Sequence, residues 1–259
     1  MHRNRQFALF FANKCNNPFG RVRLKRKELD FDNNAAFLEY SASMAIDFGD
    51  LRRTEPISRH FGYDRGLPID RHYIERFLRS NQANITGRVL EIGDDSYTCQ
   101  FGGNRVTMRD VLHVHGNNPK ATIVSDLSSG EGIPSDAFDC AIITQTLHLL
   151  YRPLAAIRTL HRVLKQGGVL LVTVPGITPM SVDEWSTTWY WSFTKHLVRK
   201  MFESTFGPEQ VRIEAHGNVF AATCFLEGIA VEDISLPELD ARDPNYDVLI
   251  AVRAQKSYV

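Results

Sequence analysis

Cysteine is scarce in this sequence, and long apolar segments are missing. The four cysteines stand singly among 259 residues without a Cys-x-x-Cys pair, and His113 and His115 lack a third ligand at metal-binding spacing. No segment approaches the ~20 apolar residues of a membrane span. No G-x-G-x-x-G motif is present to bind a dinucleotide. We therefore expect a metal-free globular protein of the reducing cytoplasm.

Acidic residues are absent from the first 27 positions. This stretch holds eight Lys or Arg, whereas residues 28–259 hold 22 Lys or Arg against 30 Asp or Glu. The formal net charge of zero therefore conceals a basic arm attached to an acidic body. We divide the chain into an arm and lead-in at residues 1–55 and one folded domain at residues 56–259, a length that can bury a single core.

The basic arm has two interpretations. A solvated tail is the simpler one, because a run of like charge is usually exposed to water. The other is contact with an anionic membrane surface through Phe7, Phe10 and Phe11. The apolar run at residues 7–12, which contains these three residues, is short for a signal peptide. An acidic stretch at residues 227–247, with seven Asp or Glu and one Arg, offers the arm a docking site within one chain or between copies of a homo-oligomer.

Short apolar runs alternate with helical patterns from about residue 85 onward. Apolar spacing predicts a helix over residues 69–78, and Pro153 suits the first turn of another that Gly167 and Gly168 end. The run at residues 169–174 is apolar on both faces, as in a parallel sheet covered on both sides. The pattern predicts an α/β fold with a doubly wound, mostly parallel, seven-stranded sheet. The expected strands are residues 88–92, 105–108, 121–124, 138–143, 169–174, 211–215 and 246–252.

Acidic residues follow the first three expected strands. In open α/β sheets, ligands bind beyond the carboxyl ends of the strands. Glu91 ends the first strand, Asp110 follows the second and Asp126 follows the third. Asp110 stands 19 residues after Glu91, the spacing at which an acid meets ribose hydroxyls in nucleoside-binding folds. The arrangement predicts a pocket for a nucleoside.

Five motifs follow one another along this domain. They are VLEIG at 89–93, RD at 109–110, SDL at 125–127, FDCAIITQTLH at 138–148 and RVLKQGGVLLVTVPG at 162–176. Together these motifs resemble the class I S-adenosylmethionine-dependent methyltransferases, in particular the small-molecule, type 11-like group. The resemblance spans about residues 69–253. Residues 56–78 are also similar to a segment of methyltransferase-like proteins encoded among bacterial glycan-assembly genes.

The resemblance implies S-adenosylmethionine as the cofactor and assigns residues to it. Gly93 would border the methionine part, Asp110 would bind the ribose hydroxyls, and Asp126 would accept a hydrogen bond from the adenine amino group. The acidic loop suits this cofactor, which carries no phosphate but two cationic groups. The remaining candidates for cofactor binding are Glu91, Asp94, Asp95, Leu127 and Gln145.

The loop after the first strand departs from the family pattern. The family reads E-x-G-x-G-x-G, whereas this chain reads EIGDDSYT, with Asp95 and Tyr97 in place of the second and third glycines. Glycine there lets the backbone approach a ligand closely. The departure favours a second hypothesis, in which the chain is a methyltransferase-fold binding or scaffolding protein without activity.

The candidates for acceptor chemistry lie outside the cofactor motifs. His148 is a candidate general base toward an acceptor hydroxyl, with a purely structural role as the alternative. The aromatic segment at residues 185–193 forms either a cap over the sheet or a lid over the acceptor. We expect O-methylation of a small molecule or glycan, and nucleic acid is disfavoured because the body is acidic. The candidates for substrate binding are Asp70, Arg71, Tyr73, Trp189 and Phe193.

Overall fold

The computed structural model describes residues 49–258, and the basic arm with its proposed contacts lies outside this range. The residues from Arg53 onward form one compact unit, which contains the whole sheet. Gly49–Arg52, a 3₁₀ turn (η1), belongs to the preceding unit. In this described range, no helix combines the length and apolar character that a membrane crossing needs.

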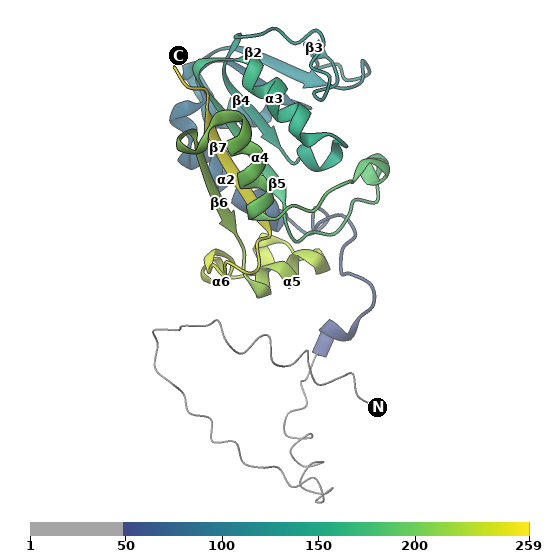
Figure 1. Cartoon of the computed structure of the whole chain (residues 1–259). Coiled ribbons are helices and arrows are strands. Elements are labelled where there is room, and N and C mark those ends of the chain that lie inside the picture. The colour runs from purple at the N-terminus through teal and green to yellow at the C-terminus, as the bar shows by residue number, and fades with distance from the viewer. Residues whose placement is uncertain (1–48, 259) are drawn as a thin grey trace, which may run out of the picture. The chain divides into compact units, whose positions relative to one another are not determined.

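Seven strands form one sheet in the order β3-β2-β1-β4-β5-β7-β6 (Figure 1). The strands β1 to β5 pair in parallel, and β7 runs antiparallel to both of its neighbours. The predicted doubly wound, mostly parallel sheet is therefore confirmed. The strands are β1 (Gly87–Ile92), β2 (Val106–His113), β3 (Ile123–Val124), β4 (Phe138–Thr144), β5 (Leu164–Pro175), β6 (Val211–His216) and β7 (Leu249–Gln255).

The helices predicted to begin at residue 69 and at Pro153 are both present. The second ends at Val163 and not at the glycine pair, because Leu164 is extended and pairs with Phe138 as the start of β5. The α-helices are α2 (Ile69–Ser80), α3 (Pro153–Val163), α4 (Lys195–Phe206), α5 (Val219–Glu227) and α6 (Leu236–Asp240). Shorter helical turns are η2 (Gln82–Asn84), η3 (Thr98–Gly102), η4 (Gly103–Arg105), η5 (Leu147–Leu149), η6 (Glu184–Thr188), η7 (Pro208–Gln210) and η8 (Val231–Asp233).

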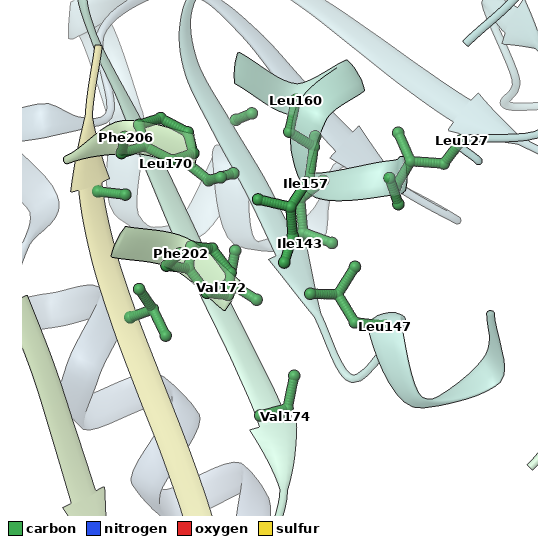
Figure 2. Packing of buried hydrophobic residues seen from close by; sticks show 14 of the residues in the cluster. Leu127, Ile143, Leu147, Ile157, Leu160, Leu170, Val172, Val174, Phe202 and Phe206 are labelled. Carbon is green, nitrogen blue, oxygen red and sulfur yellow. The ribbon is translucent and has the colours of Figure 1, made fainter. Parts of the chain in front are cut away.

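Both faces of the sheet are covered. Helices α3 and α4 pack on one face, where Ile157 and Phe202 lie among the buried side chains of β4 and β5 (Figure 2). Helices α2 and α5 pack on the other face, where Phe77 and Phe225 join the second buried cluster. A strand such as Leu170–Val174, with alternate side chains in the two clusters, is therefore apolar on both faces.

Between β1 and β4 the described residues contain no α-helix. The connections are the short turns η3 and η4 and two loops rich in Gly, Asn, Pro and Ser, which lack an apolar helical period. Strict alternation of strand and helix, which the sequence pattern predicted, therefore holds only from β4 onward. The part of the sheet beside these loops is partly open to solvent, and Met108 on β2 is 50% exposed.

Residues 53–68, which we call the strap, are attached to the C-terminal part of the chain. The backbone N–H of Leu67 donates to the Glu232 carboxylate at 2.9 Å, and Arg65 forms an ion pair with Asp233 at 3.0 Å. These two acids belong to the stretch predicted to dock the basic arm. They already have partners within the folded unit, so the number of acids available to the arm is smaller than the sequence indicated.

Candidate functional site

A cavity of about 930 Å³ lies at the carboxyl ends of the parallel strands, where the fold class predicts a ligand. One side, which we call the strand-end wall, consists of residues that end or follow strands. The other, the strap wall, comes from the strap, the start of α2, η5 with the residues that follow it to Arg152, and residues 178–190. The strand-end wall contains Ile92, Gly93, His113, Ser125, Asp126, Leu127, Thr144, Gln145 and Pro175. The strap wall contains Arg59, His60, Phe61, Tyr63, Asp70, Arg71, His148 and Trp189, among others.

The loop after β1 is held by Glu91. The Glu91 side chain is 3% exposed, and its carboxylate accepts the backbone N–H groups of Tyr97 at 3.1 Å and Thr98 at 2.8 Å. Burial raises the pKa of Glu91 to about 7, although the N–H donors act in the opposite direction. Glu91 is not part of the cavity lining. It fixes the loop, whereas Gly93, with a φ of +82°, faces the cavity.

Asp94 and Asp95 do not line the cavity either. Asp94 accepts the backbone N–H of Ser96 at 2.9 Å, and Asp95 forms an ion pair with Arg109 at 3.2 Å. Both carboxylates thus have partners inside the loop and its neighbouring strand. The predicted contact of these two acids with the cofactor is not supported, because local turn geometry already uses them.

Asp110 lies inside β2 and not after it. Its side chain is 5% exposed, pairs with Arg88 at 2.7 Å and accepts the hydroxyl of Thr122 at 3.0 Å. The expected strand end before Asp110 is wrong, because Val111 and Leu112 extend the buried strand to His113. Leu112 and His113 are therefore the β2 residues that line the cavity, a role that the sequence analysis missed.

Asp126, Leu127 and Gln145 line the cavity, and their contacts with the cofactor stay a prediction. Asp126 is exposed and accepts the backbone N–H of Ser128 at 2.7 Å, whereas Leu127 is 4% exposed. Gln145 adopts a φ of +44°, and its N–H donates to the Thr173 carbonyl at 3.0 Å. Left-handed backbone is uncommon outside glycine, so this bend after β4 is a strained feature directly beside the cavity.

His148 is buried in the strap wall with a neutral ring. It is 2% exposed, its ring centroid lies 4.3 Å from that of Trp189, and its Nδ1 atom has no hydrogen-bond partner among the described residues. Burial, with the charge of Arg71 as a second cause, lowers the pKa of His148 to about 4. At neutral pH the imidazole is therefore unprotonated and retains a nitrogen that can accept a proton.

Asp70 and Arg71 lie in the first turn of α2 and line the cavity. The Oδ1 atom of Asp70 is buried without a hydrogen-bond partner among the described residues, and burial raises the pKa of this carboxyl. Arg71 donates through Nε to the hydroxyl of Tyr63 at 2.7 Å. The structure thus brings Asp70, Arg71, His148 and Trp189 to one cavity, together with Tyr63, which the sequence analysis did not single out.

Tyr73 and Phe193, predicted to bind the substrate, are core residues that the structure does not bring to the cavity. The hydroxyl of Tyr73 donates to the Leu239 carbonyl at 2.7 Å, and its ring stacks on that of His216. Phe193 is 4% exposed within the cluster under α3 and α4. Neither lines the cavity, because both side chains are directed into the packed faces of the sheet.

Comparison with known proteins agrees with this geometry. Residues 104–172, from the turn before β2 into β5, match the family described as "Methyltransferase domain". No curated protein matches the chain. The match to this family confirms the motif resemblance to class I S-adenosylmethionine-dependent methyltransferases, and it supports S-adenosylmethionine as the cofactor.

Solved structures share the fold at low identity. A phosphoethanolamine N-methyltransferase 2 from Haemonchus contortus, in complex with S-adenosyl-L-methionine, is 14% identical with a TM-score of 0.50, over 72% of this chain and 53% of that chain. A methyltransferase from Archaeoglobus fulgidus is also 14% identical, with a TM-score of 0.48, over 72% of this chain and 94% of that chain. At this identity the likeness concerns the fold alone.

Proposed function

We propose that this chain, which carries a methyltransferase domain, binds S-adenosylmethionine at the strand-end wall and methylates a hydroxyl of a small molecule or glycan at the strap wall. The observation that carries the proposal is a single cavity that joins both walls at the carboxyl ends of β1 to β5. The bound cofactor would supply an electrophilic methyl group on a sulfonium.

The strand-end wall has the chemistry to hold that cofactor. A Cβ atom placed on Gly93 would meet nothing within 4 Å, so open space adjoins the backbone there. Asp126 offers an exposed carboxylate to a donor such as an amino group, and Leu127 offers an apolar surface beside it. The site contains no cluster of Lys or Arg on this side, as suits a ligand without phosphate.

The strap wall would orient the acceptor and take up its proton. His148 is neutral at pH 7, so one of its ring nitrogens can accept a proton or a hydrogen bond from the acceptor hydroxyl. Trp189 covers the imidazole at 4.3 Å and excludes water from that side. Orientation of two reactants in one dry cavity supplies much of the rate enhancement without a strong base.

Asp126 provides the direct test of cofactor binding. We expect wild-type protein to bind S-adenosylhomocysteine in isothermal titration, and Asp126→Ala to bind it at least about tenfold more weakly, the effect of losing one hydrogen bond to a charged group. Asp136→Ala is the matched control, because Asp136 also lies in a turn but pairs with Lys256 outside the cavity. Absence of binding by the wild-type protein would contradict the proposal.

We expect Asp110 to contribute to stability and not to cofactor binding. Asp110→Asn should leave the affinity for S-adenosylhomocysteine within about twofold and lower the free energy of unfolding by about 1–2 kcal/mol, because a hydrogen-bonded charge is lost beside Arg88. Urea denaturation and titration on the same samples measure both quantities. A large loss of affinity at unchanged stability would return Asp110 to the binding site.

The loop after β1 keeps a second function open. Asp95 and Tyr97 stand where the family has glycine, and Asp95 is held by Arg109. A chain that binds S-adenosylhomocysteine but never consumes S-adenosylmethionine, with any acceptor offered, would be a methyltransferase-fold binding or scaffolding protein. Cofactor that copurifies with the chain and turns over on addition of an acceptor would favour the enzyme.

A further inference from the structure

The strap wall carries more positive than negative charge. Three arginines line it, from the strap, from α2 and from the residue before α3: Arg59, Arg71 and Arg152. Two acids, Asp70 and Asp183, line the same wall. Asp183 caps the turn η6 through the backbone N–H of Trp185, and burial raises the pKa of Asp70, which favours its neutral form.

Arg71 is the arginine of this wall that neutral hydroxyl groups hold in place. Arg59 lies 3.7 Å from Glu55, and Arg152 is exposed to solvent. Among the described residues, no carboxylate forms an ion pair with Arg71, and its hydrogen-bonding neighbours are the phenols of Tyr63 and Tyr97. The phenols orient the guanidinium, and the Asp70 carboxyl acts on its charge through space without forming an ion pair. A half-buried guanidinium that no carboxylate binds directly can still pair with an anionic ligand.

Tyr63 adds a second donor beside this charge. Its hydroxyl oxygen accepts from Arg71 Nε at 2.7 Å, so its own hydrogen remains available to another acceptor. The guanidinium also lies over the Tyr63 ring, 6.0 Å from the centroid, which fixes both side chains relative to one another. A guanidinium and a phenolic O–H held together form a recognition site for a carboxylate or phosphate.

An aromatic surface lies on the same wall. The rings of Phe61, from the strap, and Trp189, from the segment after β5, stack with centroids 6.2 Å apart and an interplanar angle of 13°. The indole Nε1 of Trp189 is buried and has no hydrogen-bond partner among the described residues. The wall thus offers a flat apolar face and a cation within one cavity.

We infer that the methyl acceptor is an anionic, planar small molecule. Its carboxylate or phosphate binds Arg71 and Tyr63, its ring lies against Trp189, and its hydroxyl meets His148. This inference rests on the proposed function, because it assigns a substrate class to the same cavity. It selects a charged small molecule over a neutral glycan, whose hydroxyls carry no charge to pair with Arg71.

The experiment compares three phenolic probes that differ in one substituent. Protein saturated with S-adenosylhomocysteine is titrated with 4-hydroxybenzoate, with 4-hydroxyphenyl phosphate and with the neutral 4-hydroxybenzyl alcohol. We expect at least one anion to bind about tenfold or more tightly than the alcohol, the strength of a charge-assisted hydrogen bond. Comparison of the two anions then tells whether the site prefers a carboxylate or a phosphate.

Variants of the protein test which residue causes the preference for an anionic probe. Arg71→Met should remove the preference for the anion, and Arg71→Lys should retain part of it, because the charge remains without the planar fork. Arg59→Met is the matched control, since Arg59 also lines the cavity but already has Glu55 as a partner. It should keep the preference within about twofold, because an exposed ion pair contributes little. Thermal unfolding of each variant verifies that it is folded.

The outcomes separate this inference from the proposed function. If S-adenosylhomocysteine binds but the alcohol binds as tightly as both anions, or if no anion binds, the inference is wrong and the proposed function stands. If Arg71→Met keeps the full preference, the anion site lies elsewhere and the inference is also wrong. If S-adenosylhomocysteine itself does not bind, the proposed function fails, and anion binding to the free protein is then compared in the same variants.

Discussion

His148→Ala is expected to lose about 100- to 10,000-fold in turnover, the contribution typical of a positioned general base, while it keeps the affinity for S-adenosylhomocysteine within about twofold. His148 lies in the strap wall beside Trp189 and has a free Nδ1. Its loss therefore removes the proton acceptor without touching the strand-end wall. Single-turnover rates and isothermal titration on the same preparation measure the two effects separately.

The pH dependence of turnover gives a second test of the role of His148. Burial lowers the pKa of His148 to about 4, so its ring stays neutral as the pH falls from 8 to 5, and turnover should show no step near 6.5 from this residue. His161→Ala is the control, because His161 packs against Phe206 outside the cavity. Full turnover in His148→Ala would assign this histidine a structural role only.

Glu91→Ala is expected to lower the free energy of unfolding by about 2–6 kcal/mol, because two backbone N–H groups lose their acceptor at about 1–3 kcal/mol each. These are the N–H groups of Tyr97 and Thr98, which Glu91 holds beneath the loop after β1. Cofactor affinity should fall as well, since Gly93 lies in the same loop. Urea denaturation and titration with S-adenosylhomocysteine measure the two losses.

Glu91→Gln separates the charge from the hydrogen bonds. The amide offers one acceptor oxygen and places an NH₂ group against the second N–H donor. We therefore expect Glu91→Gln to lower the free energy of unfolding by less than Glu91→Ala does. Burial raises the pKa of Glu91 from 4.5 to about 7, so the folded wild-type chain binds more protons than the unfolded one between these values. Its stability relative to Glu91→Gln should therefore rise as the pH falls from 7 to 5. A pH-independent difference would contradict this.

The sheet could be predicted because its strands are buried on both faces. Apolar runs such as residues 169–174 admit few alternatives, and Pro153 marks a helix start through its fixed φ. The helix end was missed because Leu164 suits a helix as well as a strand, and only its pairing with Phe138 decides between them. Local preference yields to tertiary pairing at such boundaries.

The site was predicted less completely, for reasons of register. An acid near a strand end counts as a site residue only if the strand stops there, and β2 continues past Asp110 to His113. On α2, Tyr73 shares the buried face with Ile69 and Phe77, whereas Arg71 points to the cavity. The apolar spacing of this helix already indicated that Tyr73 lies on the buried face and Arg71 does not. Tyr63 carried no sequence signal, because only the folded strap brings its hydroxyl to Arg71.

The attachment of the strap has a consequence for the order in which the molecule is assembled. The backbone N–H of Ser58 donates to the Glu227 carbonyl at 3.0 Å, and that of Val231 donates to the Leu67 carbonyl at 2.8 Å. Each bond joins residues more than 160 positions apart, and such long-range closures form slowly. During synthesis the strap finds these partners only after residue 233 has emerged from the ribosome. A nascent chain that still lacks residues 227–233 therefore has no finished acceptor site.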